Sequence, residues 1–89
     1  MKALLIHHHE NNVDAYAPRW AGTYGEAKAI AREVPKHLRE EVVVEEFDVQ
    51  TDKAGIIAAL NGEPVYDKKA LRTWGITARG ALAEEGPAQ

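Results

Sequence analysis

The sequence contains no cysteine and no serine. Without cysteine the chain can form no disulfide, thiolate zinc site or iron–sulfur cluster, and it has no cysteine nucleophile. Without serine it also lacks the nucleophile of the serine hydrolases. These absences exclude several large enzyme classes, and they favour a non-catalytic protein over an enzyme.

Long apolar runs are missing as well. The longest near the start, Ala-Leu-Leu-Ile at residues 3–6, is far shorter than the ~20 residues that span a bilayer or the 7–15 of a signal-peptide core. We therefore expect a cytoplasmic protein that does not bind membranes. The net charge of −3 also disfavours a general nucleic-acid binder. Abundant charged residues with few Asn, Gln and Met are typical of a thermophile.

The length of 89 residues, 45% of them hydrophobic, suits one globular domain with one core. We expect a single α/β domain over residues 1–85 and a disordered tail over residues 86–89, which read Gly-Pro-Ala-Gln. A domain this small gains stability by pairing, so the length also predicts a two-fold homodimer.

The clearest element is a helix that starts after Thr23. Glu26 follows three residues later and completes a capping box, in which two side chains satisfy backbone N–H groups at a helix start. Pro35 lacks an N–H group and predicts that the helix ends near Val34. One apolar stripe along this helix contains Ala27, Ile30, Ala31, Val34 and Leu38.

Strands are predicted on both sides of this helix. Residues 2–8 form a short apolar run without helical period, and residues 41–49 contain three consecutive valines. Residues 10–22 contain asparagine, proline and glycine, and we expect them to be mostly loop. Because a helix joins the two strands, we expect a parallel βαβ unit with a right-handed crossover.

The rest of the chain is less regular. Thr51 or Asp52 can cap a helix that ends at Asn61-Gly62, and Pro64-Val65-Tyr66 reads as a brief strand. After that strand, the capping residues favour two helices, from Asp67 to Trp74 and from Thr77 to Glu85.

The alternative for this last third is a turn at residues 67–69, a strand over residues 71–76 and a helix only over residues 77–85. The predicted core of the whole chain comprises Leu4, Ile6, Ala27, Ile30, Val34, Val42, Val44, Phe47, Val49, Ile57, Leu60 and Leu71.

Part of the chain resembles the thioredoxin-like family. Ala17-Pro18 followed by residues 20–24, Trp-Ala-Gly-Thr-Tyr, is similar to the thioredoxin stretch that leads from a strand through Trp-Cys-Gly-Pro-Cys into a helix. Residues 46–49 resemble the next strand of that family, and Pro64 resembles the proline before its third core strand. The resemblance implies a thioredoxin-like topology. Ala21 and Tyr24 occupy the cysteine positions, so disulfide exchange is not implied.

Three consecutive histidines are the most conspicuous candidates for a site. On an extended chain His7 and His9 point to one face and can share a zinc or nickel ion, with Glu10 or His37 as a further ligand. The alternative is that these side chains lie hydrogen-bonded at a strand end, in which case the protein has no cofactor.

A second candidate is a contact surface beside the helix start, formed by Arg19, Trp20, Thr23 and Pro64 together with the histidines. It lies where a thioredoxin-like fold presents its partner groove. We therefore expect a small protein- or ligand-binding domain with a protein as one class of partner. The alternatives are a metal-binding protein or enzyme built on the histidines, and a nucleic-acid-binding module. The last would use the basic residues Lys68, Lys69, Arg72 and Arg79 on two C-terminal helices.

Overall fold

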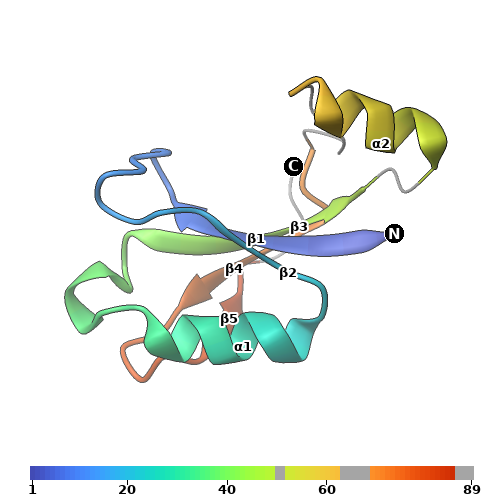
Figure 1. The fold of residues 1–89 in the computed structure, drawn as a ribbon. Coiled ribbons are helices and arrows are strands. Elements are labelled where there is room, and N and C mark those ends of the chain that lie inside the picture. Colours follow the sequence, from blue (N-terminus) through green and yellow to red (C-terminus); the bar gives the residue numbers. More distant parts are fainter. Residues whose placement is uncertain (50–51, 63–68, 86–89) are drawn as a thin grey trace.

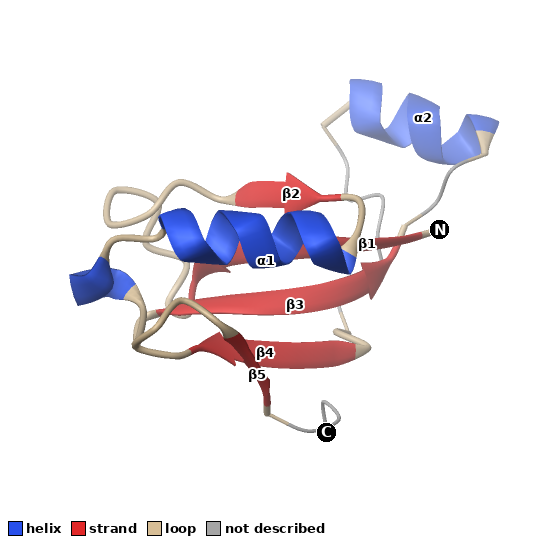
Figure 2. Ribbon diagram, turned by 90° about the horizontal axis from the view of Figure 1, so that it is seen from below, coloured by secondary structure: helices blue, strands red, loops and turns tan. Residues whose placement is uncertain are grey.

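Five strands form one sheet in the order β2-β1-β3-β4-β5, and one helix packs along one of its faces (Figures 1 and 2). The computed structural model describes residues 1–49, 52–62 and 69–85. Its elements are β1 (Lys2–His8), β2 (Arg19–Ala21), α1 (Tyr24–Glu33), a 3-10 turn (Lys36–Leu38), β3 (Val42–Asp48), α2 (Lys53–Leu60), β4 (Arg72–Ile76) and β5 (Leu82–Glu84). The predicted α/β class is confirmed.

The predicted parallel pairing of the first two long strands is wrong. β1 and β3 pair antiparallel, from Lys2 opposite Asp48 to His8 opposite Val42, and the other neighbouring strands of the described sheet are antiparallel too. The reason is β2, which lies in the segment predicted as loop. β2 turns the chain back along β1 before α1 begins, so α1 delivers β3 in the opposite direction to β1. The described strands therefore do not show the parallel unit around which a thioredoxin-like topology is expected.

The start and end of α1 are confirmed. Thr23 Oγ1 accepts the backbone N–H of Glu26 at 3.1 Å, and the Glu26 carboxylate accepts the backbone N–H of Gly22 at 3.2 Å. The bond from the Glu26 carboxylate therefore goes to the N–H group of the residue before the cap and not to the N–H group of Thr23 itself. Val34 is already extended, with ψ 127°, because the residue before a proline avoids the helical region.

Replacing the cap should weaken the domain measurably. Thr23→Ala leaves the N–H of Glu26 without its protein acceptor, and we expect the free energy of unfolding to fall by about 0.5–2 kcal/mol in urea denaturation. Thr23→Ser keeps an oxygen at the same place and should retain most of the stability. Equal losses in the two variants would show that the hydroxyl does not act as the cap.

The core lies between α1 and the facing side of the sheet. Seven of the predicted core residues are buried there: Leu4, Ile6, Ala27, Ile30, Val34, Val42 and Val44. Phe47 is also buried, but on the opposite face of the sheet. Val49 is half-buried. The prediction is wrong for Ile57, Leu60 and Leu71, which are exposed. The two α2 residues are exposed because α2 stands apart from the sheet, beyond the N-terminal end of β1 (Figure 1).

The C-terminal third is a β-hairpin, so the two-helix prediction is wrong. The alternative strand over residues 71–76 is confirmed as β4, but the helix that both interpretations place over residues 77–85 is replaced by a turn and β5. Trp74 and Ile76 are buried on one side of β4, while Thr73 and Gly75 alternate with them, and this period of two is that of a strand. The basic helices of the nucleic-acid alternative are therefore absent from the described residues.

The boundaries predicted for α2 are confirmed. Asp52 Oδ1 accepts the backbone N–H of Gly55 at 2.9 Å, and Gly62 follows the helix in the left-handed region with φ +75°. Among the helices of the described segments, none has the length and apolar composition that crossing a membrane requires. The predicted strand at Pro64-Val65-Tyr66 and the predicted tail over residues 86–89 lie outside the described residues.

Candidate functional site: a pocket beside His7

The face of the sheet turned away from α1 carries the candidate site. Residues that pair directly across strands share a face, so Trp20, Leu5 and Glu45 form one row across β2, β1 and β3. This row alternates with core residues such as Ile6 and Val44, which face α1. The row is therefore on the side of the sheet that α1 leaves uncovered.

The connection between β1 and β2 turns this face into a pocket. Residues 9–18 lie beside the row and enclose a cavity of about 260 Å³, which we call the His7 pocket. Its lining is half apolar and half polar: Leu5, Val13, Pro18 and Trp20 on the one hand, and His7, His8, Asn11 and Tyr16 on the other.

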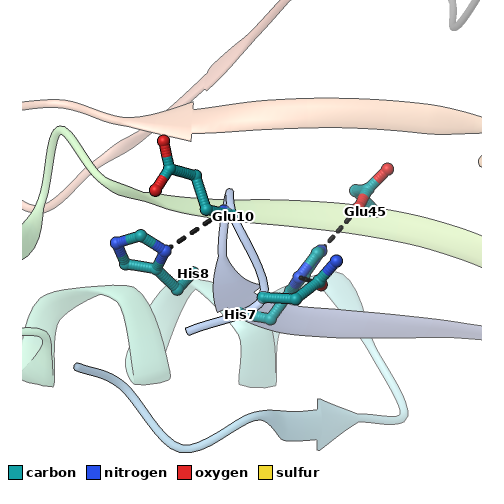
Figure 3. Close-up of polar contacts among 5 residues, drawn as sticks. His7, His8, Glu10 and Glu45 are labelled. Carbon is teal, nitrogen blue, oxygen red and sulfur yellow. Dashed lines mark hydrogen bonds and ion pairs between the residues drawn. The ribbon is translucent and has the colours of Figure 1, made fainter. Parts of the chain in front are cut away.

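His7 is held on both ring nitrogens. Its Nε2 lies 2.5 Å from Glu45 Oε1 and its Nδ1 lies 3.2 Å from Asn11 Oδ1. His7 pairs with Val43, so Glu45 is its diagonal neighbour two residues further along β3. Figure 3 shows the His7 ring directed at Glu45. Since a carboxylate only accepts hydrogen bonds, His7 Nε2 is the donor of the hydrogen bond to Glu45. The ring is 8% exposed and has a fixed orientation.

Asn11 owes its position to a tight turn. Its backbone N–H is donated to His8 O at 2.8 Å, and its φ of +59° lies in the left-handed region that asparagine tolerates better than most residues. Next to it, Asn12 Oδ1 accepts the backbone N–H groups of Asp14 and Ala15. These local bonds bring the Asn11 amide back to the end of β1, where it meets His7.

His8 faces the other way and is bonded to the same turn. Its Nδ1 accepts the backbone N–H of Glu10 at 3.1 Å (Figure 3), and its ring stacks on His9 with centroids 4.7 Å apart and 23° between the planes. A backbone N–H can only donate, so Nδ1 holds the lone pair and the proton of the neutral ring is on Nε2.

The structure groups the histidines differently from the pair predicted as metal ligands, His7 and His9. The alternation of β1 ends at His8, and the group whose ligand atoms lie within 4.8 Å of one another is His8, His9 and Glu10, without His7. The exposed His37 lies in the 3-10 turn, outside that group.

The geometry of this group fits zinc or nickel poorly. A metal-bound histidine offers one nitrogen lone pair and donates from the other nitrogen, whereas the lone pair of His8 is already bonded to Glu10. Two rings stacked 23° from parallel also direct their in-plane lone pairs side by side rather than at one point.

Tyr16 is one of the polar residues that line the pocket. Burial raises the pKa of its phenol above the usual range, and the neighbouring Arg19 guanidinium opposes that shift. The phenol therefore remains neutral near pH 7. Arg19 itself donates to Glu33 on α1 at 3.0 Å.

The predicted contact surface is only partly brought together. Trp20 lines the pocket, is 45% exposed and lies with its ring 6.1 Å from that of Phe47. Arg19 forms an ion pair with Glu33. The Thr23 hydroxyl accepts the backbone N–H of Glu26 as the cap of α1. Pro64 lies outside the described residues.

Sequence reasoning missed the two partners of His7. On its face of β3 Glu45 stands between Val43 and Phe47, and a half-buried carboxylate there needs a donor. That position is the signal that could have identified it. Asn11 carried no comparable signal, because its role depends on the turn that follows β1.

Comparison with known proteins adds no relative: no family model, curated protein or solved structure matches the chain. We therefore infer the function from the geometry of this site.

Proposed function

We propose that the protein is a small non-catalytic binding domain and that the His7 pocket holds one ring-sized apolar group of a ligand. The observation that carries this proposal is the combination of apolar walls with a few polar groups held in fixed positions. Binding sites are commonly built in that way, with the apolar surface supplying affinity and the polar groups supplying orientation. Leu5 and Trp20 form such walls, and His7 is the most firmly fixed polar group.

The size of the pocket limits what it can hold. Pockets for drug-sized ligands measure ~300–1,000 Å³, and the His7 pocket measures about 260 Å³. A single aromatic ring with a small substituent suits that volume, whereas a dinucleotide or a flavin exceeds it.

Binding accounts for the His7 arrangement better than catalysis does. A carboxylate that orients an imidazole is also found in general-base catalysis, where the second ring nitrogen faces the reacting group. In this protein that second nitrogen faces Asn11, and the sequence has no serine or cysteine for it to activate. The His7–Glu45 pair therefore serves here to fix one wall of the pocket.

A titration with toluene tests the proposal. We expect weak, saturable binding, about millimolar, that shifts the indole N–H resonance of Trp20 and the amide resonances of Asn11 in NMR spectra of the labelled protein. Trp74 is an internal control, because its ring is buried on the α1 side of the sheet. Its indole resonance should not move.

Two variants show whether the pocket itself is responsible. Trp20→Ala removes an apolar wall and should abolish the saturable shift at Asn11. Tyr24→Ala removes an aromatic ring of equal exposure, 45%, outside the pocket, and should leave the affinity unchanged. Shifts spread evenly over the surface, or equal affinities in the two variants, would rule out this site.

A further inference from the structure

We infer that the ligand of the His7 pocket carries a positive charge beside its ring, as an arylalkyl ammonium ion does. This inference rests on the proposed function, because it specifies the ligand of the same pocket. The cavity accounts for the ring, and the distribution of charged side chains around the cavity accounts for the charge.

The Lys and Arg residues of the described strands lie on one side of the sheet. Strand register places Lys2, Arg19 and Arg72 on the side that α1 covers. Acidic residues balance them there. Lys2 lies opposite Asp48. Arg72 lies opposite Glu46.

The other side of the sheet, which we call the open face, carries negative charge. Glu45 lies between Leu5 and Thr73 in the register, with no basic residue directly across from it. Glu85 donates its backbone N–H to Thr73 O at 2.8 Å. Its Oε1 lies 2.6 Å from the position that a Cβ atom would take at Gly75, so this carboxylate lies over the open face as well.

The His7–Glu45 pair does not reverse this sign. It carries one negative charge when the His7 ring is neutral and none when the ring is protonated. The pair therefore adds no positive charge in either state, whichever amide atom of Asn11 faces the ring.

The connection that encloses the pocket is acidic too. Residues 9–18 contain Glu10 and Asp14 and no Lys or Arg. Both acidic residues are exposed, and each adjoins a residue that lines the cavity, Asn11 in the first case and Val13 in the second. The field at the mouth of the pocket therefore attracts cations and repels anions.

The aromatic wall of the pocket suits the same charge. Trp20 lines the cavity and is 45% exposed, so a ligand can reach its indole. Tryptophan is the side chain on which a cation is held best. An ammonium group attached to a ring inside the pocket would therefore be favoured both by the surrounding carboxylates and by Trp20.

Three one-ring probes test this selection on the intact chain by NMR titration: benzylamine, which is protonated at pH 7, benzyl alcohol and benzoate. We expect benzylamine to bind about 3- to 10-fold more tightly than benzyl alcohol, and benzoate to bind more weakly than benzyl alcohol by a similar factor. Such factors are typical of a few charge–charge interactions through water. In about 1 M salt, where the Debye length is ~3 Å, most of the difference should disappear.

Glu10→Gln/Asp14→Asn is the decisive variant. It removes two negative charges beside the pocket and keeps the size of both side chains. The preference for benzylamine over benzyl alcohol should fall at least about 2-fold, and the affinity for toluene should not change. Glu46→Gln/Glu84→Gln is the matched control, because it removes two negative charges from the α1 side of the sheet and should leave the preference as it is.

The outcomes separate the two proposals. If toluene binds at Trp20 but benzoate binds as tightly as benzylamine, or if the two double variants behave alike, the selection for cations is wrong and the pocket remains. If neither toluene nor any of the three probes shifts the pocket resonances, the proposed function fails and the inference fails with it.

Discussion

Ile6→Ala should lower the free energy of unfolding by about 2–5 kcal/mol, the range found for truncating a fully buried large aliphatic residue. Ile6 is 0% exposed and lies on the interior strand β1, opposite Val44 of β3 and beneath α1. Its loss removes apolar contacts with the sheet and the helix at once and leaves a cavity between them. Urea denaturation followed by circular dichroism measures the change as a shift of the midpoint at constant slope.

Leu60→Ala provides the contrast. Its position on an apolar helix face predicts that Leu60 belongs to the core, yet Leu60 is 82% exposed. We expect a change within about 0.5 kcal/mol, as for most surface substitutions. A loss as large as that of Ile6→Ala would mean that α2 packs on the sheet after all.

Gly80→Ala is expected to cost about 2–5 kcal/mol, for two reasons that add. Gly80 has φ +82°, where a side chain costs about 1–2 kcal/mol. A Cβ atom there would also lie 3.2 Å from Arg32 Cα and 3.1 Å from Arg39 Nη2, and overpacking of this kind costs about 1–3 kcal/mol.

Neither neighbour of Gly80 can easily yield. Arg32 presents its backbone, and the Arg39 guanidinium donates to the carbonyls of Arg32, Val34 and Ala78. These bonds tie the end of α1 to the turn between β4 and β5.

Gly62→Ala isolates the backbone contribution. Gly62 has nearly the same φ, +75°, but nothing lies within 4 Å of its Cβ position. We expect a loss of about 1 kcal/mol from the conformation alone. If Gly62→Ala and Gly80→Ala destabilise equally in urea denaturation, the packing contribution at Gly80 does not exist.

The elements that could be predicted from the sequence are those determined by local patterns. Thr23, Glu26 and Pro35 mark the ends of α1, and the valines of β3 suit a pleated strand, so these segments are where periodicity and capping place them. The same kind of signal predicts the wrong structure near the C-terminus. Gly75 and Thr77 resemble a helix stop and a helix cap, yet the burial of Trp74 on the sheet is what decides the conformation there.

Pairing between distant segments could not be predicted. Arg19–Ala21 has no strand pattern of its own, and it is a strand only because it pairs with β1. Because β2 is not predicted, the direction expected for β3 is opposite to the observed one. The homodimer and the thioredoxin-like resemblance stay predictions that the fold of one chain does not test.

Only part of the candidate site could be predicted from the sequence. The histidine run drew attention to His7, but Glu45 is 38 residues away and reaches it through strand register. Alternation along an extended chain paired His7 with His9, whereas the turn after His8 pairs it with Asn11 instead. Alternation along the strand therefore identifies His7 as a site residue but does not predict its hydrogen-bond partners, Asn11 and Glu45.

The interior position of β1 has a consequence for the order in which the molecule can assemble. β1 comes first in the chain, yet it lies between β2 and β3, and its pairing with β3 joins Lys2 to Asp48. During synthesis β1 can pair with β2 early, but its other edge stays open until residues 42–48 have emerged. Contacts between such distant residues require a large loop to close, and proteins dominated by them fold slowly. The hairpin of β4 and β5 pairs with β3, so it can extend the sheet only on the side of β1 opposite β2, and only after β3 is in place.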